Sequence, residues 1–341
     1  MKILIYSDLH FRQGKPIGKR FTHHNHQLIE TCKWIGSLVK QYDIDLLVFC
    51  GDLFHTASKI TAEEIEATHE GLYRIYEHMP HSGKNHIMIT GNHDIYSEEF
   101  TALSMFSEFD SEISVVRNNF VYDFDGLYFA GWGYDITQLK GGKALFCHAE
   151  FKGAKFNNYA VCDHGIKPSD MRGRFNKIFC GHYHNRGKIG DIKFVGSPVC
   201  QTFADSDSFN RGVCIYDTES DKCKNFINPY TDLFMQITIP DDPCFNLYHV
   251  VKKVPHKERT NLRIHASYAE DVDQMCKITE GFKSVTIVRF EVDQEKYEIG
   301  EIEVIENVEE LDVIGGYIKS VDTKKLDKEH LIRIGRDLLL N

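Results

Sequence analysis

The stretch Lys2-Ile3-Leu4-Ile5-Tyr6-Ser7-Asp8-Leu9-His10 joins an uninterrupted apolar run to two side chains of the kind that bind metals. Short runs rich in Ile, Leu and Val, without polar alternation, are typical of strands that are buried on both faces of a parallel sheet. We therefore predict a buried strand over Lys2–Ser7 that stops directly before Asp8 and His10.

The same arrangement recurs twice, with helical segments in between. Leu46–Cys50 and His86–Thr90 are again short and apolar, and the apolar residues from Leu28 to Leu38 fall at helical spacing. Thr61-Ala62-Glu63-Glu64 has the pattern of a capping box, and we expect the helix that it opens to run to about Met79. An order of strand, helix, strand, helix, strand predicts a parallel sheet.

The following part of the chain predicts further strands with fewer helices between them. These strands are expected at Leu127–Gly131, Ala144–Cys147, Lys177–Cys180, Lys193–Val195 and Val213–Asp217. Such a pattern favours a second, mixed sheet. We therefore predict an α/β fold in which two sheets form a sandwich flanked by helices, in the layer order αββα.

The pattern changes near residue 230, which predicts three domains at 1–230, 231–300 and 301–341. The middle one reads as a small α+β domain, with strands at Leu233–Pro240, Leu262–Ala266 and Val285–Val292 and a helix at Ala269–Thr279. The last one reads as a helical tail with amphipathic segments at Val308–Lys319 and Asp327–Leu340. The apolar face of that tail either packs on its own domain or docks onto a helix of a partner.

Composition limits the class of protein. The chain has 341 residues, 42% hydrophobic and 26% charged, which suits a globular protein with ample core. It has no apolar run long enough for a membrane span, and its first residues lack a signal-peptide pattern, so we expect a cytoplasmic protein. The ten cysteines are scattered, with no C-x-x-C pair, which favours buried reduced thiols.

The net charge of −10 is not that of a protein that binds nucleic acid over its whole surface. Local basic patches or bound cations would have to attract a polyanion. The His-rich segment Arg12–His26 is either a solvated loop or a basic lip for a phosphate backbone. The cluster of Arg172, Arg174 and Lys177 has the same two interpretations.

Polar motifs follow the predicted strands and supply potential metal ligands. Residues i and i+2 of an extended segment point the same way, so Asp8 with His10, and His182 with His184, can each bind one ion. The candidate ligands are Asp8, His10, Asp52, Asn92, His148, His182 and His184. Imidazole, carboxylate and amide ligands without thiolate fit Mn²⁺, Fe²⁺ or Zn²⁺ better than Ca²⁺ or Mg²⁺ alone.

The order D-x-H, G-D, G-N-H-D, H and G-H-x-H resembles the calcineurin-like metallophosphoesterase superfamily, over residues 1 to about 200. The resemblance implies two metal ions that promote in-line attack of water on phosphorus. Asp8, His10, Asp52 and His184 would hold one ion, and Asp52, Asn92, His148 and His182 the other. His93 would assist the leaving oxygen, and Asp94 would orient His93.

Within that superfamily, Gly51-Asp52-Leu53-Phe54-His55 resembles the DNA-repair nucleases of the SbcD and Mre-eleven type. The resemblance implies that His55 is needed for nuclease action. It also implies that the small domain caps DNA and that the tail docks onto an SMC-like ATPase of the SbcC or Rad-fifty type. The compact length is similar to that of phage-encoded members.

These features lead to the hypothesis of a Mn²⁺-dependent DNA nuclease. The resemblance implies 3′-to-5′ exonuclease action on double-stranded ends, endonuclease action, an SMC-like partner and a homodimer. One alternative is a phosphodiesterase that acts on a small nucleotide or a cyclic phosphodiester. Another is a non-catalytic scaffold that binds a coiled coil, although a scaffold has no need of so complete a set of ligand-type residues.

Overall fold

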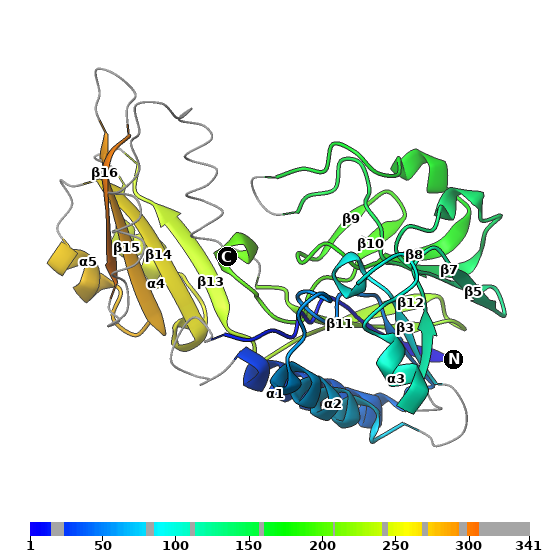
Figure 1. Cartoon of the computed structure of the whole chain (residues 1–341). Helices are drawn as coiled ribbons and strands as arrows, with labels where there is room; N and C mark the ends of the chain where they lie inside the picture. Colours follow the sequence, from blue (N-terminus) through cyan, green and yellow to red (C-terminus); the bar gives the residue numbers. More distant parts are fainter. Residues whose placement is uncertain are drawn as a thin grey trace. The chain divides into compact units, whose positions relative to one another are not determined.

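The structure is a computed structural model (Figure 1) that describes residues 1–14, 24–79, 85–109, 113–156, 160–206, 209–240, 245–267, 272–292 and 299–306. For residues 107–109, 289–292 and 299–306 it describes the backbone alone. The described residues form two compact units. The second unit comprises Gln201–Ser206 and the chain from Asp232 onward, and the first comprises the rest.

The first unit contains a six-stranded sheet built around the opening strand. The strand order is β12-β11-β1-β2-β3-β4, and the last four strands run parallel. The elements are β1 (Lys2–Tyr6), α1 (His24–Tyr42), β2 (Leu46–Phe49), α2 (Ala62–Tyr76), β3 (His86–Ile89), α3 (Ser104–Phe109), β4 (Ile113–Val116), β11 (Gly212–Asp217) and β12 (Lys222–Ile227). The predicted capping box is present, since the Thr61 and Glu64 side chains each accept the other's backbone N–H.

One strand belongs to a different sheet from the one predicted. We expected Val213–Asp217 in the second sheet, but β11 pairs antiparallel with β1, with Ile5 opposite Cys214. The prediction was wrong because β11 is buried along most of its length, and an apolar strand carries no local sign of which neighbour it will pair with.

The second sheet of this unit is mixed, as predicted. Its order is β5-β6-β7-β8-β10-β9, with parallel pairing from β6 to β10 and antiparallel pairs at both edges. The strands are β5 (Val121–Phe124), β6 (Leu127–Ala130), β7 (Gly142–Cys147), β8 (Phe175–Cys180), β9 (Gly187–Ile189) and β10 (Ile192–Phe194).

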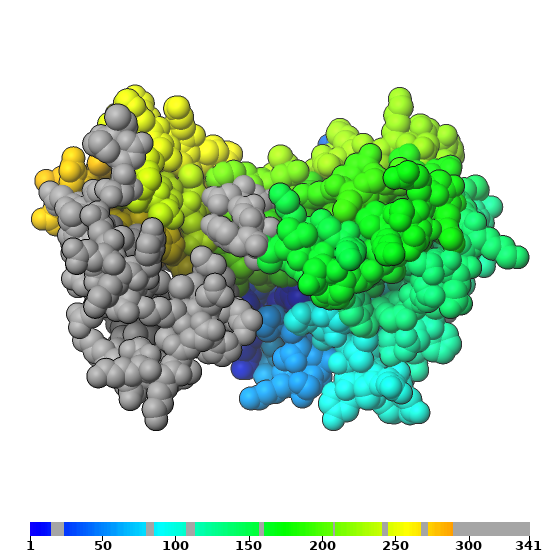
Figure 2. Space-filling model, turned by 90° about the horizontal axis from the view of Figure 1, so that it is seen from above, coloured from blue at the N-terminus to red at the C-terminus, as the bar shows by residue number. Residues whose placement is uncertain are grey.

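The two sheets pack face to face. Ile3 and Val48 of the first sheet share a buried apolar cluster with Phe129, Phe146 and Phe179 of the second. A second cluster joins α1 and α2 to the outer face of the first sheet. In the space-filling view, the blue and cyan surface of the early part of this unit adjoins the green surface that contains most of the second sheet (Figure 2).

The outer face of the second sheet differs from the predicted layer of helices. Among the described residues it is covered by loops and by the short 3₁₀ helices η2 (Ile136–Gln138) and η3 (Pro168–Met171), through residues such as Phe151 and Met171. The unit is therefore a two-sheet α/β sandwich whose long helices lie on one side.

The second unit is a smaller α+β structure with its own core. Its sheet has the order β13-β14-β15-β16, and Leu262 and Ile264 are fully buried between this sheet and its helices. The elements are η4 (Phe203–Asp205), β13 (Leu233–Thr238), α4 (Leu247–Lys252), η5 (Lys257–Arg259), β14 (Thr260–Ser267), α5 (Val272–Ile278), β15 (Ser284–Val292) and β16 (Ile299–Glu306).

The predicted start of a tail at residue 301 is wrong for the first residues of that segment. β16 (Ile299–Glu306) pairs antiparallel with β15 and completes the sheet. The acidic side chains at Glu301, Glu303 and Glu306 favour a solvated segment, but the first two alternate with Ile302 and Val304, which is the pattern of a strand. The predicted helical segments at 307–341 lie outside the described residues.

The structure bears on two predictions from composition, the state of the cysteines and the search for a membrane-spanning helix. The nine cysteines in the described part of the chain are free thiols, and seven of them are buried. Among the helices described, none combines the length and the apolar character that crossing a bilayer requires.

Candidate metal centre

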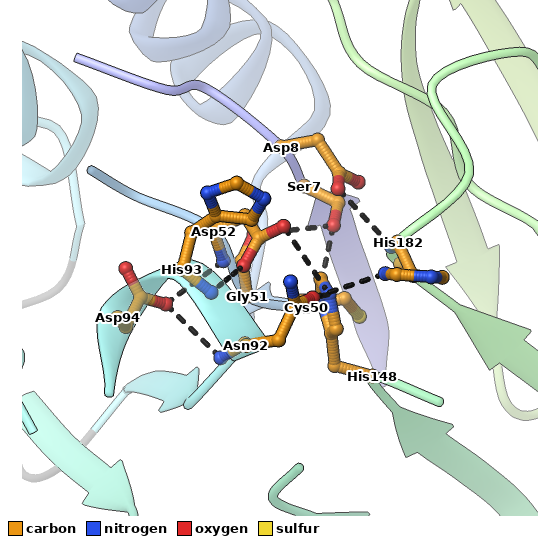
Figure 3. Close-up of polar contacts among 12 residues, drawn as sticks. Ser7, Asp8, Cys50, Gly51, Asp52, Asn92, His93, Asp94, His148 and His182 are labelled. Atoms are coloured by element: carbon orange, nitrogen blue, oxygen red, sulfur yellow. Dashed lines mark hydrogen bonds and ion pairs between the residues drawn. The ribbon is translucent and has the colours of Figure 1, made fainter. Parts of the chain in front are cut away.

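Adjacent parallel strands bring the polar motifs together. β1, β2 and β3 are neighbours in the first sheet, and the segments that follow them carry Asp8 and His10, Asp52, and Asn92. β7 and β8 are neighbours in the second sheet and lead to His148 and to His182 with His184. Side chains from both sheets thus meet where the carboxyl ends of the strands lie (Figure 3).

One cluster contains Asp8, His10 and His184, with one ligand-type atom of each within 4.8 Å of the others. The Nε2 atoms of His10 and His184 lie only 3.1 Å apart. Asp8 Oδ1 accepts the backbone N–H of His182 at 3.1 Å, which ties the end of β1 to the loop after β8. The structure therefore brings together three of the four residues predicted for the first ion.

A second cluster contains Asp52, His148 and His182, again with ligand-type atoms within 4.8 Å. Asn92 completes it, because its Oδ1 lies 3.1 Å from His148 Nε2 and 3.0 Å from His182 Nδ1. All four residues predicted for the second ion are thus side by side.

Asp52 lies between the two clusters. Its Oδ2 is 3.7 Å from Nε2 of His10 in the first cluster and 3.3 Å from Nε2 of His148 in the second. The Asp52 residue is only 1% exposed, so this carboxylate is shielded from solvent. A buried carboxylate in contact with both imidazole sets has the position that a bridging ligand requires.

The backbone fixes the orientation of the His148 ring. Its Nδ1 lies 2.6 Å from the carbonyl oxygen of Cys50, which can accept a hydrogen bond but not donate one. Nδ1 therefore carries a proton, and Nε2 is the atom that faces Asp52 and Asn92. Metal-binding histidines are commonly held in this way by a hydrogen bond from the other ring nitrogen.

The protonation states suit cation binding. Burial lowers the pKa of His10 well below its usual range and that of His182 to about 3, so both rings are neutral and offer a lone pair. Burial opposes charge on Asp52 and His148 as well, but their mutual attraction prevails, which lowers the pKa of Asp52 and raises that of His148. A divalent cation can take the place of the proton that this pair shares, so the residues present fit a metal centre.

The backbone is strained at several of these residues. Asp8, His10, Asp52 and His182 have φ angles of 56°, 52°, 61° and 79°, in the left-handed region that side chains disfavour. Gly181 is needed for a different reason: a Cβ there would collide with the Cys50 carbonyl and with the Ser7 hydroxyl group. Strain of about 1–3 kcal/mol per residue persists at sites where the side-chain position matters, and this arrangement is such a site.

His55 and His93 form the exposed side of the centre. Their rings are stacked with centroids 5.7 Å apart, and the centroid of the His10 ring lies 5.0 Å from that of His93. His93 Nδ1 is 2.6 Å from the carbonyl oxygen of His55, and its backbone N–H donates to Asp52 Oδ1 at 2.9 Å. The nitrogens of His10, His55 and His93 also lie within 4.8 Å, so geometry alone allows a third set of ligands that shares His10.

Asp94 does not have the predicted role of orienting His93. Its carboxylate accepts the backbone N–H groups of Gly91, Asp52, Leu53 and Phe54 at 2.8–3.2 Å, while the His93 ring contacts the His55 carbonyl. His93 and Asp94 are neighbours in the loop after β3, but their side chains point to different partners. Asp94 therefore joins the loop after β3 to the loop after β2, and it acts on Asp52 through the backbone.

Replacing Asp94 by Ala is expected to lower the free energy of unfolding by at least about 3 kcal/mol, because several buried N–H groups would lose their acceptor. Urea denaturation measures this loss. Asp94→Asn keeps an acceptor oxygen and should lose less. A loss under about 1 kcal/mol for the Ala variant would contradict the role in joining the loops.

The structure adds Glu150, which follows His148 by two residues and was not among the predicted site residues. Glu150 Oε1 lies 3.5 Å from His182 Nε2, and Oε2 lies 3.1 Å from Nε2 of the exposed His164. His182 Nδ1 faces Asn92 in the second cluster, so Glu150 acts on the opposite side of the ring. The only signal in the sequence was a carboxylate two residues after a ligand.

Glu150→Gln is expected to weaken metal binding by about 10- to 100-fold, as loss of a carboxylate partner of a metal-binding histidine commonly does. Isothermal titration of the full-length protein with Mn²⁺ measures this change. Asp163→Asn provides the control, because Asp163 contacts His164 but has no contact with His182. Equal metal affinity in wild type and Glu150→Gln would show that Glu150 does not support His182.

The structure describes part of the two basic segments that the sequence left open as either solvated surface or phosphate contacts. Arg174 donates to the carbonyl oxygens of Thr137 and Leu139, and Lys177 pairs with Asp221 at 2.5 Å, so both have structural partners. Arg172 is exposed. Within Arg12–His26, residues 15–23 lie outside the described residues, and His24 is buried in α1.

Comparison with known proteins agrees with this geometry. The sequence profile of the calcineurin-like phosphoesterase family matches residues 1–188, more than half of the 341 residues. The chain therefore belongs to that family. The family and the His/Asp clusters together define a metal-dependent phosphoester hydrolase.

The other comparisons are with individual proteins. A comparison with curated proteins found no match. Among solved structures, the chain is similar to the purple acid phosphatase PPD1 from yellow lupin (Lupinus luteus) seeds, with 13% identity and a TM-score of 0.38, over 66% of this chain and 52% of that one. The chain thus spans about half of that structure, and so distant a likeness assigns no substrate.

Proposed function

We propose that this phosphoester hydrolase is a DNA nuclease that cuts phosphodiester bonds of duplex DNA, as exonuclease from 3′ ends and as endonuclease. The observation that carries the proposal is the position of His55. This residue, three positions after Asp52 in Gly51-Asp52-Leu53-Phe54-His55, is exposed beside the centre and holds His93 through its carbonyl oxygen. An exposed imidazole beside a half-buried one at the rim suits a long substrate that lies across the centre.

Each protein group has a defined part in the proposed reaction. The hydrogen bond from His93 Nδ1–H to the His55 carbonyl leaves Nε2 to face the phosphate. A proton on that Nε2 can pass to the leaving oxygen as the P–O bond breaks. The ring of His55 lies 5.7 Å from those of both His10 and His93, and it would position the strand.

The two clusters would hold divalent cations, and the ligand set of imidazole, carboxylate and amide suits Mn²⁺. When bound, these cations would neutralise charge on the phosphodiester and make water a better nucleophile. Asp52 would hold both ions, and Glu150 and the Cys50 carbonyl would fix the His182 and His148 rings.

The test compares substrates for the full-length protein with Mn²⁺. We expect linear duplex DNA to be degraded much faster than bis-p-nitrophenyl phosphate or a cyclic nucleotide. We also expect His55→Ala to reduce cleavage of duplex DNA more than cleavage of the small phosphodiester. A preference for the cyclic nucleotide would replace the nuclease with a small-molecule phosphodiesterase.

The proposal extends to partners. An SMC-like ATPase would control access of DNA, and a homodimer could form through α2, where Ile65 and Tyr73 are exposed. Co-purification with an SMC-like ATPase, and the mass of the free protein in solution, test these two points. A monomer that binds no such ATPase would leave the nuclease to act alone.

A further inference from the structure

A cavity of about 280 Å³ lies at one edge of the first unit, and none of the candidate metal ligands lines it. It is lined by residues of β8, β9 and β10 from the second sheet and of β11 and β12 from the first. Its volume is just below the range of about 300–1,000 Å³ that is usual for ligand sites, which suits a small group rather than a large molecule.

The cavity is basic. Arg186, Lys188 and Lys193 line it together with the amides Asn210 and Asn225, and no Asp or Glu is among its lining residues. In the part of the chain that the structure describes, none of these three cations takes part in an ion pair. Cationic side chains that share a cavity without a counter-charge repel one another, and an anion would remove that repulsion.

Arg186 is held ready for such an anion. Its Nε donates to the Val195 carbonyl at 3.1 Å, and its two terminal nitrogens donate to Asn210 Oδ1 at 3.3 Å and to the Phe226 carbonyl at 3.4 Å. A guanidinium group has five N–H donors, so two remain for a ligand.

Lys193 completes the site from β10. Its ammonium group lies 3.7 Å from Sγ of Cys214 on the neighbouring strand β11, and no carboxylate lines the cavity beside it. Lys188, exposed on β9, supplies a third cation at the rim.

We propose that this cavity is a binding site for an oxyanion of the phosphate type, separate from the metal centre. Arg186 would present its two remaining N–H groups to phosphate oxygens, while Lys193 and Lys188 would add charge-assisted hydrogen bonds. The phosphate could come from free inorganic phosphate or from a nucleic-acid backbone. The site is independent of the nuclease function, because it needs neither bound metal nor cleavage.

The test uses the full-length, metal-loaded protein and the variants Lys193→Gln and Lys188→Gln. Isothermal titration with inorganic phosphate is expected to show at least about tenfold weaker binding to this site in Lys193→Gln. Lys188→Gln keeps the interior intact, because Lys188 is exposed. This variant should also bind phosphate more weakly than wild type. Lys40→Gln removes an equal charge from the exposed end of α1 and should leave phosphate binding unchanged.

A second titration distinguishes the two sources of phosphate. A phosphorothioate duplex that resists cleavage is bound over a range of salt concentrations. If the cavity takes a backbone phosphate, the slope of log K against log salt should fall by about 0.9 in Lys193→Gln. An unchanged slope with weakened phosphate binding would indicate free phosphate. Phosphate affinity equal to that of wild type in both variants, or equally weakened by Lys40→Gln, would overturn the proposal.

Discussion

Replacing Asp52 by Asn is expected to reduce bound metal from about two ions per chain to one or fewer. Phosphodiester hydrolysis should fall by more than about 100-fold, because loss of a residue that only supports a metal ligand already costs up to that factor. The reason is the position of Asp52 Oδ2, 3.7 Å from His10 Nε2 and 3.3 Å from His148 Nε2. A neutral amide has one acceptor oxygen and cannot bridge two cations as a carboxylate does. Metal content by mass spectrometry and cleavage of duplex DNA measure both effects.

The Asn variant is a mild change for the fold. Asn at this position keeps an oxygen that can accept the backbone N–H of His93, so circular dichroism should show a folded protein. Asp123→Asn, an exposed change of the same kind, should retain full metal content and activity. Retention of two ions by Asp52→Asn would remove Asp52 from the position of bridge.

Replacing His93 by Gln is expected to slow cleavage of duplex DNA by about 10²–10⁴-fold, the range for loss of a general acid. Metal content should remain that of wild type, because His93 contributes its backbone N–H, and not its ring, to Asp52. The two substitutions therefore separate metal binding from proton transfer. Single-turnover cleavage with saturating Mn²⁺ measures the chemical step alone.

The leaving group provides the control for His93. A substrate with a p-nitrophenolate leaving group needs little protonation, so His93→Gln should lose much less activity on it than on DNA. Equal losses on both substrates would show that the ring does not act as the acid. Loss of metal from the variant would instead make His93 a ligand in the set with His10 and His55.

The sequence predicted the interior of the first sheet well because each of its strands carries its own signal. β1, β2 and β3 each end one residue before the predicted end, and the capping box at Thr61 begins α2 as expected. Edge strands were missed for a physical reason. β12 (Lys222–Ile227) is largely exposed and carries two exposed lysines, so its stability comes from pairing with β11 rather than from burial of an apolar run.

The candidate ligands could be predicted because each one follows a strand, and parallel strands bring such positions to one edge. Contacts made through the backbone could not be predicted from the sequence. The His55 carbonyl that receives His93 Nδ1 lies 38 residues away in sequence, and the N–H groups that occupy Asp94 belong mainly to the loop after β2. Such partners depend on how two loops pack, and no local pattern records that packing.

Diffraction from crystals of the full-length protein grown with Mn²⁺ tests the central claim most directly. The expected anomalous map has two manganese peaks about 3.5–4 Å apart, on either side of Asp52 Oδ2. One peak should lie among Asp8, His10 and His184, and the other among Asn92, His148 and His182. A single peak, or a peak held by His10, His55 and His93 in place of the first, would contradict the two-metal centre bridged by Asp52.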